Sequence, residues 1–215
     1  MNTTLQTASL VAALALGFTL GGHQTDGSTD TSEPAQDQKP SPTEPALTDD
    51  MLAWIQAGTP GEMHRLMDPL IGTWDAQVTL FMDPTDPAVV EVSNGTMVNE
   101  WILDGRYVRG DFDGMAMGQP FQGMSLFAYD NAMQTYRGLW IDSMSTGLQE
   151  SAGYADEAGN AWTMITTTTD PATGGPMNGK ERIVFESDDR LVMTAWYELE
   201  GAMVKSMEIA YTRRQ

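Results

Sequence analysis

Residues 72–82 read GTWDAQVTLFM, and this stretch decides how the rest of the chain is interpreted. Apolar side chains occupy every second position from Trp74 to Met82, and mostly polar side chains stand between them. Successive side chains of a strand point to opposite faces, so the pattern predicts a strand with one buried face. Asp83-Pro84 follows at once and is expected to end the strand.

The same period of two recurs through the remainder of the chain, with turn-forming residues between the segments. The predicted segments are roughly 89–102, 106–113, 121–129, 135–142, 147–154, 161–169, 180–187, 190–199 and 203–213. Breaks of two to four residues, such as Asp104-Gly105 and Asp113-Gly114, are typical of hairpins. The fold class expected is therefore mainly β, with roughly ten antiparallel strands in up-and-down order. A flat sheet would leave two edges and a wet apolar face, so we expect closure into a barrel. A barrel of this width can enclose a ligand cavity.

Two short helices are expected before the first strand. Thr48 precedes two aspartates, which is typical of an N-cap followed by acids at the positive end of the helix dipole. Thr59-Pro60-Gly61-Glu62 predicts a second start, as a capping box with proline at the first helical position. These helices would cap one mouth of a barrel domain spanning 48–215.

The first 47 residues divide into two parts that are not expected to belong to the barrel. Residues 1–22 contain an apolar run, Leu10–Leu20, which is too short to span a bilayer and is typical of a signal peptide. Residues 23–47 are rich in Pro, Ser, Thr, Asp and Gln, and predict a disordered acidic linker. His23 stands where a bacterial lipoprotein signal carries its lipidated cysteine, so no lipid anchor is expected. We therefore expect an exported protein, periplasmic or extracellular, without a membrane span.

Composition excludes several classes of function. The formal net charge is −19, which argues against nucleic acid or an anionic membrane surface as partner. The sequence contains no cysteine, so it offers no thiolate nucleophile and no zinc-thiolate site. It contains two histidines, and we expect no Ser-His-Asp triad. His64 is the one histidine in the predicted domain, and it lies in a helix, where a capping or packing role is the simpler interpretation. No strand contains histidine to ligate haem. No metal site, no cofactor and no catalytic residue is expected.

Several runs resemble the bacterial family known as domain of unknown function 1579. The matching runs are 60–64, 70–74 (LIGTW), 99–107 (NEWILDGRY), 120–123, 129–131, 140–147 (WIDSMSTG) and 208–213 (EIAYTR). The resemblance implies a lipocalin-like, calycin-type barrel and implies no particular activity. Gly72-x-Trp74 is itself similar to the first-strand signature of lipocalins, in which a basic residue of the last strand packs on the tryptophan. The resemblance thus implies a structural role for Trp74 together with Arg213 or Arg214.

The segment 106–113 is the most polar predicted strand, and it allows two interpretations. Its alternation places Tyr107 and Arg109 on one face, together with two aspartates. The simpler interpretation is a solvated outer face. The alternative directs Tyr107 and Arg109 into the barrel as a polar anchor for a ligand carboxylate or carbonyl, with Glu100 and Trp101 beside them.

The segment 140–147 runs from a strand into a hydroxyl-rich turn. Asp142 and Ser143 either line the mouth of the barrel or simply make the turn through their own side chains. The candidate ligand-binding residues are thus Trp101, Tyr107, Arg109, Trp140 and Asp142.

Three functions remain open. The first is a non-enzymatic binder of a small, mainly apolar ligand inside the barrel. The second is an enzyme of the isomerase, cyclase or decarboxylase type that uses Tyr, Arg and carboxylates; it requires a buried acid, for which Glu100, Asp111 and Asp142 are the candidates. The third is a structural or interaction module of the cell envelope, which a large exposed apolar patch would favour.

Overall fold

The computed structural model describes residues 47–215. The proposed signal peptide and nearly all of the proposed linker lie outside these residues. The helices are α1 (Asp49–Ala57) and α2 (Glu62–Arg65), followed by a 3₁₀ turn at Asp68–Leu70. The strands are β1 (Gly72–Phe81), β2 (Val90–Ile102), β3 (Tyr107–Ala116), β4 (Gln119–Asp130), β5 (Thr135–Asp142), β6 (Gln149–Ala155), β7 (Ala161–Thr169), β8 (Pro176–Ser187), β9 (Arg190–Leu199) and β10 (Ala202–Arg213).

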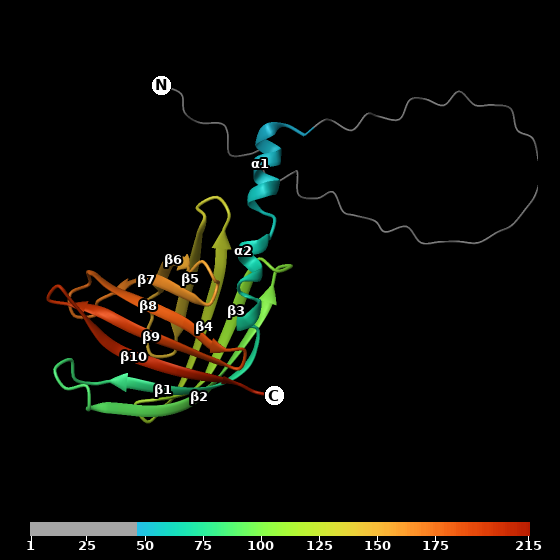
Figure 1. Cartoon of the computed structure of the whole chain (residues 1–215). Helices are drawn as coiled ribbons and strands as arrows, with labels where there is room; N and C mark the ends of the chain where they lie inside the picture. The colour runs from blue at the N-terminus through green and yellow to red at the C-terminus, as the bar shows by residue number, and fades with distance from the viewer. Residues whose placement is uncertain (1–46) are drawn as a thin grey trace, which may run out of the picture. The chain divides into compact units, whose positions relative to one another are not determined.

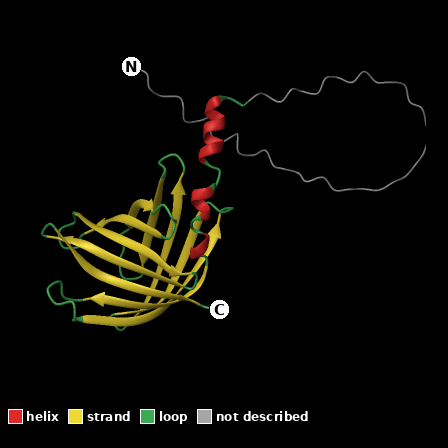
Figure 2. Ribbon diagram, viewed as in Figure 1, coloured by secondary structure: helices red, strands yellow, loops and turns green. Residues whose placement is uncertain are grey.

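The strands form a closed antiparallel barrel, as the sequence predicted. Each strand pairs with the next one along the chain, and β1 also pairs with β10 to complete the wall (Figures 1 and 2). The closing seam runs from Trp74 opposite Arg213 to Leu80 opposite Met207. The apolar side chains of β1 that alternate along the sequence face the interior, which explains why the period of two predicted the fold.

One predicted turn is misplaced. The sequence suggested that a turn at Asp113-Gly114 ends the third strand, but β3 continues to Ala116 and turns at Met117-Gly118, both with positive φ. Gly114 stays inside the strand because it lies directly opposite Gly95, and a Cβ on Gly114 would come within 2.8 Å of the Gly95 Cα. The glycine here permits a close approach of two strands and does not make a turn.

Helix α1 is held only at its C-terminal end. Thr48 caps its start, with Oγ1 accepting from the Met51 amide at 3.3 Å, as predicted. At the other end, the Asn131 side-chain amide donates to the carbonyls of Ala57 (3.1 Å) and Thr59 (2.8 Å). No residue of α1 is buried, and Figure 1 shows the helix extending beyond the barrel.

The N-cap of helix α2 is Gly61, so the predicted capping box at Thr59 is wrong. The Thr59 hydroxyl instead donates back to the Ile55 carbonyl at 2.6 Å. His64 caps the helix, because its Nδ1 accepts from the Gly61 amide at 3.1 Å. The Tyr136 hydroxyl of β5 donates to the Met63 carbonyl at 2.8 Å, which fixes α2 against one end of the barrel.

The barrel is solid at the end that α2 covers. The largest fully buried side chains gather there: Trp74, Trp162, Tyr136, Met67 and Met164. Their rings interlock, with Tyr136 stacked on Phe127 at 5.6 Å between centroids and Phe185 edge-on to both tryptophans. This aromatic plug closes one end of the barrel.

Candidate functional site

The other part of the interior is a cavity of about 740 Å³. Its lining is mainly apolar and includes side chains from all ten strands. The aromatic and methionine residues that line it are Trp74, Met97, Phe112, Met115, Met117, Phe121, Phe127, Trp140, Met144, Met164, Met177, Met193, Tyr197, Met207 and Tyr211, together with the backbone of Trp196. Such a space is of the size that small-molecule sites occupy, roughly 300–1,000 Å³.

The cavity reaches the end of the barrel opposite the plug. Trp74 and Leu70 lie at its inner limit, whereas Met117, Met144 and Ser145 belong to loops between strands at the opposite end. The mouth therefore lies at the end of the barrel formed by the loops at 82–89, 117–118, 143–148, 170–175 and 200–201. The methionine side chains there can adapt to the shape of a ligand, because they are unbranched and polarizable.

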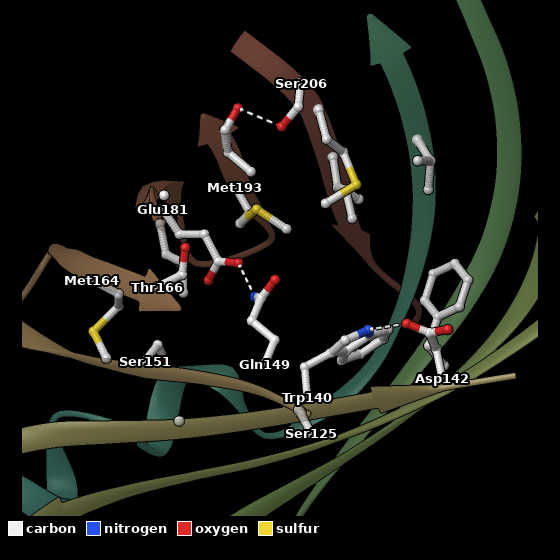
Figure 3. A pocket seen from close by; sticks show the side chains of 18 of the residues that line it. Ser125, Trp140, Asp142, Gln149, Ser151, Met164, Thr166, Glu181, Met193 and Ser206 are labelled. Atoms are coloured by element: carbon white, nitrogen blue, oxygen red, sulfur yellow. Dashed lines mark hydrogen bonds between the residues drawn. The ribbon is translucent and has the colours of Figure 1, made fainter. Parts of the chain in front are cut away.

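Two carboxyl groups line this mainly apolar space, and Glu181 is the deeper of them. Its Oε1 accepts a hydrogen bond from the Gln149 side-chain amide at 2.8 Å, across the width of β7. Figure 3 shows the two side chains pointing toward one another inside the barrel. Burial raises the pKa of the Glu181 carboxyl, and the bond from Gln149 opposes that shift only in part.

Asp142 lies at the end of β5 near the mouth. Its Oδ2 accepts from the Trp140 indole at 3.0 Å, and its Oδ1 accepts from the Met144 amide at 2.9 Å (Figure 3). Both Trp140 and Asp142 line the cavity. Trp140 is also the register partner of Gln149, so the Asp142–Trp140 pair and the Gln149–Glu181 pair lie on neighbouring strands of the wall.

Tyr107 and Arg109 lie on the outer face of β3. Tyr107 is 40% exposed, and Arg109 pairs with Asp111 at 2.9 Å and approaches Glu100 at 3.9 Å, all outside the barrel. The structure therefore has the solvated outer face, and the alternative interpretation, in which these side chains point into the barrel, is wrong. Val108 and Phe112 take the inner positions of this strand because they are apolar.

Trp101 lies on the inner side of β2 but at the plugged end. Its indole donates to Asp68 Oδ1 at 2.9 Å, next to the 3₁₀ turn. It packs against the core and is absent from the cavity lining. Of the five candidate ligand-binding residues, the structure thus brings two, Trp140 and Asp142, to the cavity.

Arg213 covers the ring of Trp74 from outside the plug. Its guanidinium carbon lies 4.1 Å from the ring centroid. Nη1 donates to the Ile71 carbonyl at 2.6 Å and Nη2 to the Pro69 carbonyl at 2.7 Å. Arg214 points away and pairs with Asp75, so Arg213 is the basic residue that packs on this tryptophan.

The sequence interpretation missed Glu181. It lies between Lys180 and Arg182, which makes the segment look solvated. Its alternation partners Ile183 and Phe185, both facing inward, were the signal that could have placed it inside.

Among residues 47–215, no group of three or more His, Asp or Glu side chains is arranged to hold a metal ion. Within the same residues, no helix is long and apolar enough to cross a membrane.

Comparison with known proteins bears on the family and the fold. No curated protein matches the sequence. The S-type phycobiliprotein lyase CPES from Guillardia theta is 12% identical, with a TM-score of 0.49, over 75% of this chain and 97% of that one. A redesigned β-barrel is 14% identical, with a TM-score of 0.39, over 72% of this chain and all of that one. The model of the family described as "Protein of unknown function (DUF1579)" matches residues 59–213, which span every strand of the barrel. The chain therefore belongs to the DUF1579 family.

Proposed function

We propose that the protein binds a small, mainly apolar molecule inside its barrel. The observation that carries this proposal is the cavity of about 740 Å³, which is closed at one end by the aromatic plug and lined largely by Met, Phe, Trp, Leu and Ile. A protein interior is normally close-packed, so an apolar space of this size is not a packing accident. Burial of an apolar ligand there would release about 25 cal/mol per Å² of surface removed from water.

A fluorescence titration tests the proposal. N-phenyl-1-naphthylamine is uncharged near neutral pH and brightens in apolar surroundings, so the full chain should bind it with one saturable site. The variant Ala195→Phe places a ring in the cavity lining and should weaken binding at least tenfold. The matched control Thr194→Phe adds the same ring on the outer face of the same strand and should bind like the unchanged protein.

Native mass spectrometry of the protein isolated from its own cells gives a second test. A reproducible added mass that is lost on denaturation would support the proposal and give the mass of the ligand. Absence of saturable probe binding, or equal binding by both phenylalanine variants, would overturn it.

We also propose that the protein is exported, which rests on the sequence alone. The apolar run Leu10–Leu20 supports this proposal. A fusion of residues 1–47 to alkaline phosphatase, which is active only outside the bacterial cytoplasm, should be active. Replacement of Leu16 by Arg should abolish that activity, and retained activity would contradict the proposal.

Glu181 favours an enzyme as the second candidate function. Burial raises the pKa of its carboxyl. Burial also raises the pKa of the Tyr211 hydroxyl, the charge of Glu181 adds to that shift, and both residues line the cavity. A carboxyl whose pKa is raised in this direction can transfer a proton to a bound molecule. Conversion of the native ligand by the unchanged protein, lost in Glu181→Gln, would favour catalysis over binding alone.

A further inference from the structure

The charges around the cavity are of one sign, which bears on the kind of ligand it takes. Two carboxyl groups, Asp142 and Glu181, line it, and no Lys, Arg or His among residues 47–215 does so. A ligand carboxylate or phosphate inside the barrel would find no cation to offset its loss of water, which is costly for a charged group. Anionic ligands such as fatty acids are thus disfavoured.

The basic residues of the barrel domain all lie elsewhere. Residues 47–215 contain ten Lys and Arg residues. Those on the outer wall are Arg109, Arg137, Lys180, Arg182 and Lys205, and those at the plugged end are Arg65, Arg106, Arg190, Arg213 and Arg214. The two lysines of the outer wall are engaged there, since Lys180 lies over the Trp196 ring and Lys205 pairs with Glu208. No basic residue among residues 47–215 is thus placed to offset negative charge in the cavity.

The loops at the mouth carry the same sign as the cavity. They contain Asp83, Asp86, Asp170 and Glu200, and no Lys or Arg stands in any of the five loops at that end. A rim of one sign around a low-dielectric cavity concentrates ligands of the opposite sign and raises their rate of association. The mouth therefore attracts cations and repels anions.

The Glu181 side chain has one carboxyl oxygen that can accept a hydrogen bond from a ligand. Glu181 is partly buried in the cavity wall, its Oε1 accepts from Gln149, and its Oε2 has no hydrogen-bond partner among the described residues. The Oε2 of this partly buried carboxyl is therefore available to accept a hydrogen bond from a ligand donor. Beside Asp142, the rings of Trp140 and Phe121, stacked at 6.3 Å between centroids, add faces that attract a cation.

We infer that the bound molecule carries a basic nitrogen on an apolar body, with the nitrogen held by the Glu181 carboxyl and the body against the methionine and aromatic wall. This inference rests on the proposed function, because it names the ligand class of the same cavity. The nitrogen would donate to the free oxygen of Glu181, while Asp142, already oriented by Trp140, supplies negative charge nearer the mouth.

A competition series with one chain length and three head groups tests the inference. Dodecylamine, dodecanol and dodecanoate, each below its aggregation concentration, would compete with N-phenyl-1-naphthylamine for the full chain at pH 7. The amine should bind at least tenfold more tightly than the alcohol, and the dodecanoate should bind most weakly. Glu181→Gln should lower the ratio of amine affinity to alcohol affinity from at least tenfold to about one.

Two further variants control for charge and folding. Glu186→Gln makes the same change of charge on the outer face of β8, where Glu186 pairs with Arg190, and should retain the amine preference. Asp142→Asn should reduce the preference in part, which keeps the test decisive if Glu181→Gln fails to fold.

The outcomes separate the two proposals. Equal binding of amine and alcohol, tighter binding of dodecanoate, or an amine preference that survives in both Glu181→Gln and Asp142→Asn would overturn the inference and leave the binding function standing. Failure of the naphthylamine probe and of all three chains to bind would overturn the proposed function itself.

Discussion

The indole of Trp140 lies directly against the Cα of Gly123 on the neighbouring strand, so closely that a Cβ on Gly123 would overlap the ring. Gly123 is the register partner of Asp142, the acceptor of the Trp140 indole N–H. The missing side chain of the glycine is therefore what lets the tryptophan lie flat in the cavity wall.

Gly123→Ala should displace Trp140 and break its bond to Asp142. Overpacking of this kind costs about 1–3 kcal/mol, and binding of the naphthylamine probe should weaken with it. The control is Gly147→Ala, because a Cβ there meets nothing closer than 3.4 Å. Urea unfolding followed by tryptophan fluorescence measures the effect, and equal stability of the two variants would contradict this account of Gly123.

Arg213→Met should destabilise the barrel by about 2–4 kcal/mol, because it removes a cation from the Trp74 ring and leaves backbone carbonyls without their charged donor. Arg213→Lys should recover only part of the loss, since a lysine cannot span the carbonyls of Pro69 and Ile71 as the guanidinium does. Arg214→Met, at an exposed ion pair, should change the free energy of unfolding little. A loss for Arg214→Met as large as that for Arg213→Met would contradict the assignment.

Glu181 should make the stability of the protein fall as the pH rises. Burial raises the pKa of this carboxyl in the folded state above its value in the unfolded chain. The folded protein then holds a proton that the unfolded chain has released, so stability is highest below the unfolded pKa and is lost as the pH rises through the folded pKa. Measured at pH 5 and pH 8 by urea unfolding, Glu181→Gln should lose less stability with rising pH than the unchanged protein. Parallel losses would refute the burial of a titrating acid.

His64 should act in the opposite direction. Burial, aided by the charge of Arg106, lowers the pKa of the imidazole. Its contribution to stability is present above the unfolded pKa and is lost as the pH falls through the folded one, when protonation also removes the acceptor for the Gly61 amide. His64→Asn keeps a side-chain acceptor that does not titrate, so between pH 7 and pH 5 it should lose less stability than the unchanged protein. A steeper loss in the variant would count against this role.

Tyr136→Phe should loosen α2 from the barrel. The change leaves the Met63 carbonyl without the hydroxyl that bonds it at 2.8 Å, which costs about 1–2 kcal/mol. Tyr154→Phe is the matched control, since Tyr154 is 69% exposed. Hydrogen exchange of amides in residues 61–67 should accelerate in Tyr136→Phe alone; unchanged exchange there would show that other contacts hold the helix.

Most of the fold could be predicted because one physical rule governs it. A strand with one face in the barrel must alternate apolar and polar side chains, and β1, from Trp74 to Leu80, does so without interruption. The sequence pattern misled at Gly114, where the glycine permits a close contact between two strands. Gly114 lies directly opposite Gly95, which is 19 residues earlier in the sequence. A single sequence holds no sign of that contact, because Asp-Gly is equally typical of a turn.

The site was less predictable than the fold, because binding residues depart from the pattern that reveals strands. Trp140 and Asp142 could be placed near the mouth since a turn follows them, whereas Glu181 occupies an inner position that alternation reserves for apolar residues. An acid between a lysine and an arginine suggests solvent, and only the inward partners Ile183 and Phe185 suggest otherwise. The polar groups of Tyr107 and Arg109 suit a ligand anchor, but Val108 and Phe112 take the inner face of β3 because they are apolar.

The seam between β1 and β10 has a consequence for biosynthesis. Every other pair of strands is adjacent along the chain, whereas Trp74 must wait for Arg213, which belongs to the last strand of the barrel. Until β10 has left the ribosome, the strands already made have two unpaired edges, and the Trp74 ring lacks the Arg213 guanidinium that packs on it. A chain truncated within β10 should therefore be held by chaperones or degraded, because it can never pair its two edges.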